Sequence, residues 1–272
     1  MSILFIQPVF APDRARLDRN LDSIKSFANY IKSYPEVTID IIFGGWCNDE
    51  SYWVEIKNTI AEHIGPGIPI KKFDRNYGKA TVVNTLYNSR GDKNYTYLLT
   101  ADSDIVFDAN IPQLFERCVE AAQESENTRQ KPFGIMALNQ KGQNCHMAQF
   151  VYQNRHKYQG KYGEEEIVWP HGAGGVAGGC LFTSIKCWEA TGGYRIMSVY
   201  SGDDAYYLLD AAKKGYSLQM FETGPIIHPL DDDEEYAKWK VKVCQRDSGP
   251  RRDNINNYIN EADDFWKNRT TK

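Results

Sequence analysis

Short apolar runs alternate with amphipathic stretches through the first part of the chain. Residues 3–6 and 37–43 are mostly apolar and β-branched, which is typical of buried strands. Over residues 17–31 and 53–64, apolar side chains return every three or four positions, the spacing of one helix face. Residues 68–70 predict a further short strand of edge type. Strands and helices in alternation predict an α/β fold with a mostly parallel central sheet flanked by helices.

The pattern continues less regularly through the rest of the chain. Residues 97–101 predict a strand and residues 114–122 a helix, whereas the polar stretch 154–166 predicts a flexible loop. A later helix is expected to begin at the acidic pair 203–204 and to end at Gly215 as its C-cap. The remaining predicted strands are 133–138, 145–152, 216–221 and 226–228.

The character of the chain changes at residue 231. An acidic run, 231–235, is followed by lysines and arginines up to residue 252, with Tyr236 and Trp239 between them. Two interpretations are open, and the first is a solvated amphipathic helix. The second is a basic, aromatic surface for a polyanionic partner.

Composition narrows the class of protein. The chain has 272 residues, of which 42% are hydrophobic and 25% charged, so one large globular domain or two smaller halves can be built. A net charge of −4 gives no overall attraction to nucleic acid or anionic membranes. We expect a cytoplasmic protein, because no signal peptide and no run approaching the roughly 20 apolar residues of a membrane span is found. The six cysteines form no CxxC pair and are expected to be free thiols.

The sharpest candidate site follows the strand 97–101. Asp102 and Asp104 are two residues apart, and in an extended chain such positions face the same side. Mg²⁺ and Mn²⁺ prefer oxygen ligands, and Mg²⁺ is usually held by one or two carboxylates together with substrate phosphates. The pattern indicates a metal that clamps a diphosphate. The alternative is a strand that ends in a polar turn, since Asp and Ser are common turn formers.

Each of several other stretches has two interpretations, one as part of a functional site and one as ordinary local structure. The loop 74–80 leads polar residues and a glycine into a helix, which suits phosphate or ribose contact or is a simple junction. The glycine-rich stretch 172–179 lets the backbone approach a ligand or forms a tight turn. The acidic pair 203–204 offers a general base or a helix cap, and His228 alone is more often structural than a ligand.

Taken in order, these motifs resemble the GT-A glycosyltransferases, particularly family 2, over roughly residues 3 to 229. The shared features are an Asn-x-Gly loop with a later Asn, a DxD motif after an apolar strand, a Gly-rich strand, a Gly-Gly-Tyr turn, an acidic pair opening a helix, a Gly-Tyr and a late His. Here they are Asn76, Gly78 and Asn84; Asp102-Ser103-Asp104; Gly178-Gly179; Gly192-Gly193-Tyr194; Asp203-Asp204; Gly215-Tyr216; and His228. The chain departs from the family in having Gly44–Asp49 where an acid-rich loop often holds uracil, and Asp-Asp where Glu-Asp is usual.

The resemblance implies a metal-dependent, inverting transfer of a sugar from a nucleotide-diphosphate sugar, a UDP-sugar being favoured, to an acceptor hydroxyl. It implies one GT-A domain over 1–230, with a nucleotide-binding half, 1–108, and an acceptor half, 109–230. The change of character at residue 231 predicts a helical C-terminal tail over 231–272. Asp204 is the first candidate for the general base and Asp203 the second. The implied ligands of Mn²⁺ or Mg²⁺ are Asp102, Asp104 and His228. The implied donor-binding residues are Gln7, Pro8, Asn76, Gly78, Lys79, Asn84, Asp102, Ser103, Gly178 and Gly179.

Three questions stay open at this point. The acceptor is a saccharide or the hydroxymethyl group of a modified DNA base, as in phage DNA glycosylation, and the latter would have to be flipped out. A sugar nucleotidyltransferase is disfavoured because the stretch 7–12 after the first strand has no glycine. A non-catalytic sugar-nucleotide or glycan-binding module would not need both acidic pairs.

Overall fold

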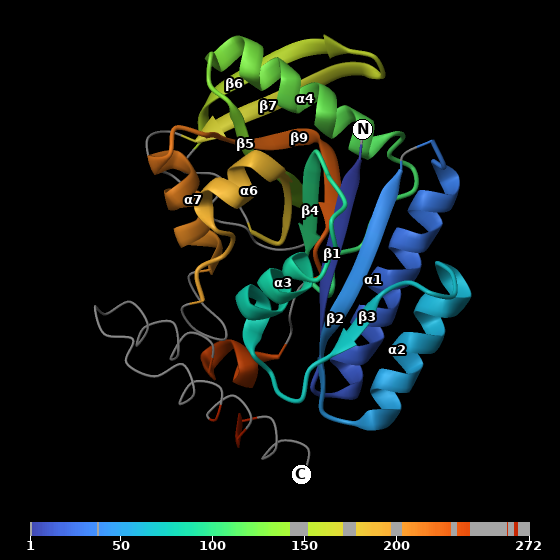
Figure 1. The fold of residues 1–272 in the computed structure, drawn as a ribbon. Helices are drawn as coiled ribbons and strands as arrows, with labels where there is room; N and C mark the ends of the chain where they lie inside the picture. The colour runs from blue at the N-terminus through green and yellow to red at the C-terminus, as the bar shows by residue number, and fades with distance from the viewer. Residues whose placement is uncertain are drawn as a thin grey trace.

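The computed structural model describes residues 2–36, 38–141, 152–170, 178–196, 203–229 and 233–239, together with residues 260, 264 and 265. The N-terminal part alternates strand and helix as predicted (Figure 1). Its elements are β1 (Ile3–Ala11), α1 (Arg14–Ser33), β2 (Ile39–Cys47), α2 (Glu50–His63), β3 (Ile70–Lys72), α3 (Gly78–Asn88) and β4 (Tyr97–Ala101). The later elements are α4 (Leu114–Arg129), β5 (Phe133–Lys141), β6 (Tyr152–Gly160), β7 (Gly163–Pro170), β8 (Cys180–Ser184), α6 (Ile185–Thr191), α7 (Asp203–Lys213) and β9 (Ser217–Ile227).

The described strands form one sheet of nine, in the order β3-β2-β1-β4-β8-β5-β9-β7-β6. The first four strands are mutually parallel, as the alternation of strands and helices predicted. Beyond β4 the sheet is mostly antiparallel, because β8 runs opposite to both of its neighbours and the β6–β7 hairpin joins β9 antiparallel. The prediction of a mostly parallel sheet is therefore wrong for this second half, where only β5 and β9 run parallel among the described strands.

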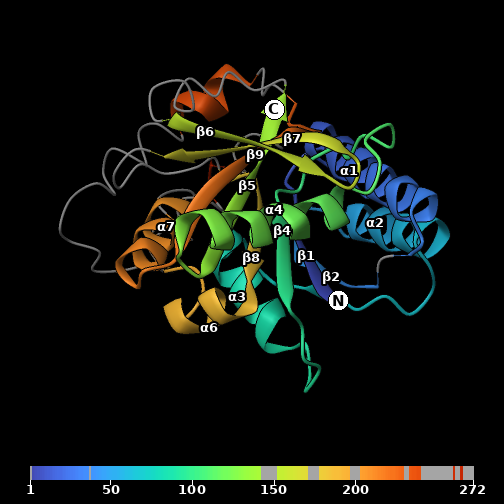
Figure 2. The same cartoon turned by 90° about the horizontal axis from the view of Figure 1, so that it is seen from above.

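Helices cover both faces of the sheet (Figures 1 and 2). One buried cluster joins α1, α2 and α4 to the sheet, and a second joins α3, α6 and α7 to its other face. Successive residues of a strand serve the two clusters in turn: Phe5 packs in the first, and Leu4 and Ile6 pack in the second. Burial on both faces is the reason that the central strands are continuous apolar runs.

Local caps explain where several helices begin and end. Asp13 accepts a hydrogen bond from the Arg16 amide and is the N-cap of α1, where a carboxylate also complements the helix dipole. The predicted helix end at Gly215 is confirmed, since α7 ends at Lys213 and Gly215 has a φ of +84°. That left-handed conformation favours glycine.

Two predictions about local structure are wrong. Residues 154–166 are not a flexible loop but most of the antiparallel β6–β7 hairpin. Arg155–Glu166 and Lys157–Glu164 ion pairs lie across this hairpin, so its strands are polar because one side faces solvent. The two last predicted strands are a single strand, β9. The predicted strand 145–152 lies almost wholly outside the described residues.

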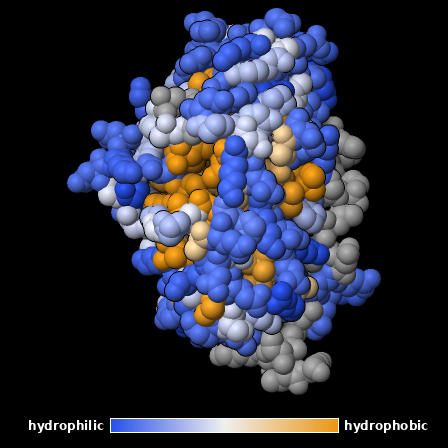
Figure 3. All heavy atoms as spheres, turned by 90° about the vertical axis from the view of Figure 1, so that its right-hand side faces the viewer, coloured by the Kyte–Doolittle hydropathy of each residue, from blue (hydrophilic) through white to orange (hydrophobic). Residues whose placement is uncertain are grey.

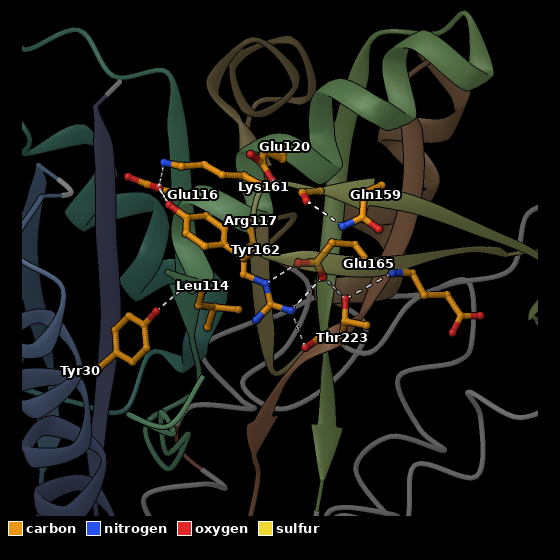
Figure 4. A network of polar contacts seen from close by, with 12 residues as sticks. Tyr30, Leu114, Glu116, Arg117, Glu120, Gln159, Lys161, Tyr162, Glu165 and Thr223 are labelled. Carbon is orange, nitrogen blue, oxygen red and sulfur yellow. Dashed lines mark hydrogen bonds and ion pairs between the residues drawn. The ribbon is translucent and has the colours of Figure 1, made fainter. Parts of the chain in front are cut away.

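A buried ion pair anchors the hairpin to the sheet (Figure 4). Arg117 of α4 donates two hydrogen bonds to Glu165 of β7, at 2.7 and 2.8 Å, and a third to the Thr223 carbonyl oxygen at 3.0 Å. Glu165 is 1% exposed, its charge is paired with the Arg117 guanidinium, and its carboxylate also accepts a hydrogen bond from the Thr223 hydroxyl group. Such a pair fixes the hairpin against α4, because either charge alone would be buried without a partner.

The outer side of α1 and α2 is mainly hydrophilic, with smaller hydrophobic areas between (Figure 3). Described parts of the tail lie against this N-terminal half: Asp233 pairs with Arg16 at 3.1 Å, and Arg16 lies over the Tyr236 ring. Within the described residues, none of the helices combines the length and the apolar character that crossing a membrane requires.

Candidate active site

The site is organised around the end of β4. The Asp102 amide donates to the Gly179 carbonyl oxygen at 2.7 Å, which ties this end to the entry of β8. Gln7 of β1, 1% exposed, donates to the Asp102 carbonyl oxygen at 2.9 Å and to the Ser23 hydroxyl at 2.7 Å. The backbone that carries Asp102 and Asp104 is thus fixed from both neighbouring strands.

Asp104 is paired with His228, which follows the end of β9. The His228 Nε2 atom lies 3.3 Å from an Asp104 carboxylate oxygen, and its Nδ1 atom lies 2.9 Å from the Gln140 side-chain oxygen. Burial alone would raise the pKa of Asp104, but hydrogen bonding to His228 and the charge of His228 outweigh burial and lower it. Burial likewise lowers the pKa of His228, and the Asp104 carboxylate reverses the effect and raises it. The two groups form a mutually stabilised acid–imidazole pair.

Asp102 and Asp204 meet at one ammonium group. The Lys79 Nζ atom lies 2.7 Å from an Asp102 carboxylate oxygen and 3.1 Å from an Asp204 carboxylate oxygen. It also donates to the Gly178 carbonyl oxygen at 2.8 Å. Burial raises the pKa of Asp102, an effect that the Lys79 charge opposes and the Asp204 charge adds to. Lys79 therefore links the end of β4 to the start of α7 and offsets the repulsion between two carboxylates.

Two glycines make room for side chains of the site. A Cβ atom on Gly178 would lie 1.8 Å from an Asp204 carboxylate oxygen, and one on Gly179 would lie 2.8 Å from the Gln140 side-chain nitrogen. Both distances are below 3.0 Å, so with a Cβ atom present the neighbouring side chain or the glycine backbone would have to shift. The Gly178-Gly179 pair thus leaves room for the Asp204 and Gln140 side chains, which pack directly against this backbone.

The Asn-x-Gly loop has local structural roles. The Asn76 side chain is buried and accepts from the Gly78 amide at 3.1 Å, which shapes the turn into α3. Asn84 donates to the Tyr194 carbonyl oxygen at 2.7 Å and accepts from the Tyr194 amide at 3.1 Å. Asn84 thus holds the Gly-Gly-Tyr turn against α3, and contact with a nucleotide stays a prediction for both asparagines.

Two other predicted donor-binding residues are Pro8 of β1 and Ser103, which follows the end of β4. Pro8 is buried in β1 opposite Gly44 of β2, and Ser103 is half-buried between the two DxD carboxylates. Residues 171–177, which include most of the glycine-rich stretch, lie outside the described residues, and so does the side chain of Asp203.

The residues present fit a divalent metal that is shared with a diphosphate. Asp102, Asp104 and His228 offer the oxygen and imidazole donors that Mn²⁺ and Mg²⁺ accept. Among the described residues, no three His, Cys, Asp or Glu side chains are grouped so that they could hold an ion by themselves. Asp104 and His228 are adjacent, however, and Mg²⁺ is usually bound by one or two carboxylates together with substrate phosphates.

Some residues of the site carry no recognisable signal in the sequence. Gln140 was not singled out, because its partner His228 is 88 positions away in the chain. Ser23 was not singled out either, although its hydroxyl group bridges Gln7 and the Ile105 carbonyl oxygen. Lys79 was placed with the donor-binding residues, and only the structure shows its contact with Asp204.

No protein-family model and no curated protein matches the sequence. Solved structures are similar in fold. The Pyrobaculum calidifontis mannosyltransferase PcManGT, in complex with GDP-Man and Mn²⁺, has a TM-score of 0.59 and 13% identity over 89% of this chain and 60% of that chain. For S. aureus TarS the TM-score is 0.53 and the identity 10%, over 84% of this chain and 60% of that chain.

A third similar structure is the glucosyl-3-phosphoglycerate synthase of Mycobacterium tuberculosis with Mg²⁺ and UDP. Its TM-score is 0.51 and its identity 11%, over 89% of this chain and 76% of that chain. The chain thus spans about 60% of the length of the first two structures. At this identity the likeness shows the fold, and it confirms the predicted GT-A glycosyltransferase fold.

Proposed function

We propose that the protein is a glycosyltransferase that moves a sugar from a nucleotide-diphosphate sugar to an acceptor hydroxyl. The fold supports this class, but a fold by itself does not fix an activity. The observation that carries the proposal is that Asp102 and Asp204, from distant parts of the chain, converge on the Lys79 ammonium beside the Asp104–His228 pair.

The donor diphosphate is expected to bind beside Lys79. Three carboxylates at this edge would repel a diphosphate, and Lys79 provides a compensating charge within hydrogen-bond distance of two of them. Asp102, Asp104 and His228 would hold Mn²⁺ or Mg²⁺. Such an ion, when bound, stabilises the charge that develops on the departing nucleoside diphosphate. The remaining donor contacts come from Gln7, Pro8, Asn76, Gly78, Asn84, Ser103, Gly178 and Gly179.

Asp204 is the proposed general base, with Asp203 as the second candidate. The acceptor oxygen forms its bond to the anomeric carbon while the bond to the diphosphate oxygen breaks. The acceptor proton passes to the Asp204 carboxylate, a role that typically contributes about 10²–10⁴-fold. Direct displacement of this kind inverts the anomeric centre. Lys79 supports the role of Asp204, because its ammonium group contacts the carboxylates of both Asp204 and Asp102, and Gly178 leaves room for the Asp204 carboxylate.

A saccharide hydroxyl is the proposed acceptor and a UDP-sugar the proposed donor. The structures similar to this chain include complexes with UDP and with GDP-Man, so both nucleotides belong in a first screen. The alternative acceptor, a hydroxymethylated base in DNA, relied on the basic stretch of the tail, and residues 240–252 lie outside the described part of the chain.

Calorimetry with nucleoside diphosphates and their sugars, with and without Mn²⁺, tests the proposal. We expect binding that requires Mn²⁺ and that is lost when Asp102 and Asp104 are both changed to Asn, while the thermal unfolding temperature is retained. Asp22→Asn on the exposed side of α1 is the matched control, and it should leave binding unchanged. Unaltered affinity in excess chelator would exclude the metal, and absence of sugar transfer from every donor would reject the activity.

A further inference from the structure

The Gly-Gly-Tyr turn that follows α6 carries a tyrosine side chain toward the centre of the sheet. Gly192 and Gly193 have φ values of +80° and +78°, a conformation that favours glycine. The turn leads directly into Tyr194, which is 2% exposed and whose hydroxyl group lies 3.1 Å from the Thr100 hydroxyl of β4. The Tyr194 side chain is thus placed against the strand that ends at the DxD motif.

The Tyr194 ring is held in place from several sides. Asn84 of α3 contacts the Tyr194 backbone amide at 3.1 Å and its carbonyl oxygen at 2.7 Å. The ring makes edge-to-face contacts with Trp188 of α6 and Tyr207 of α7, at centroid distances of 5.3 and 5.0 Å. Protein interiors are close-packed, so a ring enclosed in this way has little freedom to move. Tyr194 is therefore a rigid part of the core that α3, α6 and α7 form.

One face of this ring lies below the ammonium group of Lys79. The Lys79 Nζ atom is 5.6 Å from the ring centroid, within the roughly 6 Å at which an aromatic face attracts a cation. The Lys79 side chain is 16% exposed, and shielding from water strengthens the attraction. The same Nζ atom lies 2.7 Å from an Asp102 oxygen and 3.1 Å from an Asp204 oxygen. The ring is therefore in contact with the ammonium group that joins the two carboxylates.

We infer that Tyr194 is a positioning residue, whose ring holds the Lys79 ammonium group at the point where Asp102 and Asp204 meet. The inference rests on the proposed function, in which Lys79 offsets negative charge around the donor diphosphate and Asp204 is the general base. A diphosphate beside Lys79 competes with both carboxylates for its positive charge. The uncharged ring is fixed by its own packing, so it attracts the ammonium group with and without a donor. It thereby keeps Lys79 next to Asp204 while the donor is bound.

A double-mutant cycle in urea unfolding of the full chain, without nucleotide, tests the contact itself. Tyr194→Leu removes the ring, Lys79→Met removes the charge, and the double variant removes both. We expect the double variant to lose less stability than the two single effects together, by about 3–30-fold in the unfolding equilibrium constant. Lys213→Met on the exposed side of α7 is the control, and its effect should simply add to that of Tyr194→Leu. Tyr194→Met, which fills more of the vacated space, takes the place of Leu if that variant does not fold.

Steady-state sugar transfer, with nucleotide affinity by calorimetry beside it, tests the effect on the site. Tyr194→Leu should lower kcat/KM for the donor about 3–30-fold, whereas Tyr194→Phe, which keeps the ring and loses the hydroxyl contact with Thr100, should stay within about threefold. Tyr87→Leu is the control for lost packing, because Tyr87 is a buried ring of the same core with the Arg90 guanidinium over its face at 3.8 Å. That variant should lose stability and keep its kcat/KM.

Two kinds of result overturn the inference. The first is a cycle in which the losses from Tyr194→Leu and Lys79→Met simply add, since the ring then holds no ammonium group. The second is full transfer by folded Tyr194→Leu, or an equal loss of transfer in Tyr87→Leu or in Tyr194→Phe, since packing or the hydroxyl group would then be the cause. If the unaltered protein binds no nucleotide and transfers no sugar, the proposed function fails, and the cycle still decides whether Tyr194 holds Lys79.

Discussion

Changing Gly178 to Ala displaces the proposed general base, Asp204, while the Asp204 side chain itself stays chemically unchanged. The added Cβ atom would lie 1.8 Å from one Asp204 oxygen and 2.0 Å from the carboxyl carbon. Real Cβ atoms essentially never approach within 3.0 Å of another group, so the oxygen or the Gly178 backbone must move by about 1.2 Å. The Gly178 carbonyl oxygen also accepts from Lys79, so a backbone shift would loosen that contact as well.

The expected effect is large on turnover and small on stability. A misplacement of about 1 Å at a reacting group can cost on the order of 100-fold. Overpacking costs about 1–3 kcal/mol of folding free energy in a closed core. Here the neighbour is a half-exposed carboxylate, and the loss of a glycine from the unfolded chain restores about 0.4–1 kcal/mol. The free energy of unfolding should therefore change by less than about 1 kcal/mol.

The assay is steady-state sugar transfer, with nucleotide affinity by calorimetry and unfolding by urea beside it. Gly215→Ala is the control, since Gly215 has a φ of +84° and open space around it. That variant should lose about 1–2 kcal/mol from the left-handed conformation and keep its turnover. If Gly178→Ala retains turnover within about threefold of the unaltered protein, Asp204 is not the base at this position.

Three further predictions concern the substitution of single side chains. Asp204→Asn should lower turnover by about 10²-fold or more while nucleotide affinity stays nearly unchanged, and a dead Asp203→Asn would instead assign the base to its neighbour. Glu165→Leu should cost about 3–5 kcal/mol in urea unfolding because Arg117 stays buried without its partner, and Leu at both positions should recover much of the loss. Burial raises the pKa of Glu222, so the stability linked to this group is complete below its unfolded pKa and is lost as the pH rises through the folded one. Glu222→Gln should therefore unfold at a higher temperature than the unaltered protein at neutral pH, and scans in acid, where Glu222 is protonated, should show no difference.

Local periodicity in the sequence determined the first half of the fold and the centre of the site. The strand–helix alternation up to β4, the cap at Asp13 and the position of Asp102 and Asp104 after a buried strand all follow from residues close together in the chain. Such features depend on side-chain spacing and on hydrogen bonds between residues close in the chain, so they can be predicted from short stretches of the sequence.

Only the tertiary structure decided the second half of the sheet and the partners within the site. Strand β8 is inserted between β4 and β5, and the polar stretch 154–166 forms a hairpin. Both features depend on how the whole sheet buries its apolar faces, and no local pattern in the sequence predicts them. Lys79 meets Asp204 across 125 positions, and His228 meets Gln140 across 88. Contacts of that range are fixed by how strands from distant segments pair and close the core, and no short window of the sequence contains that information.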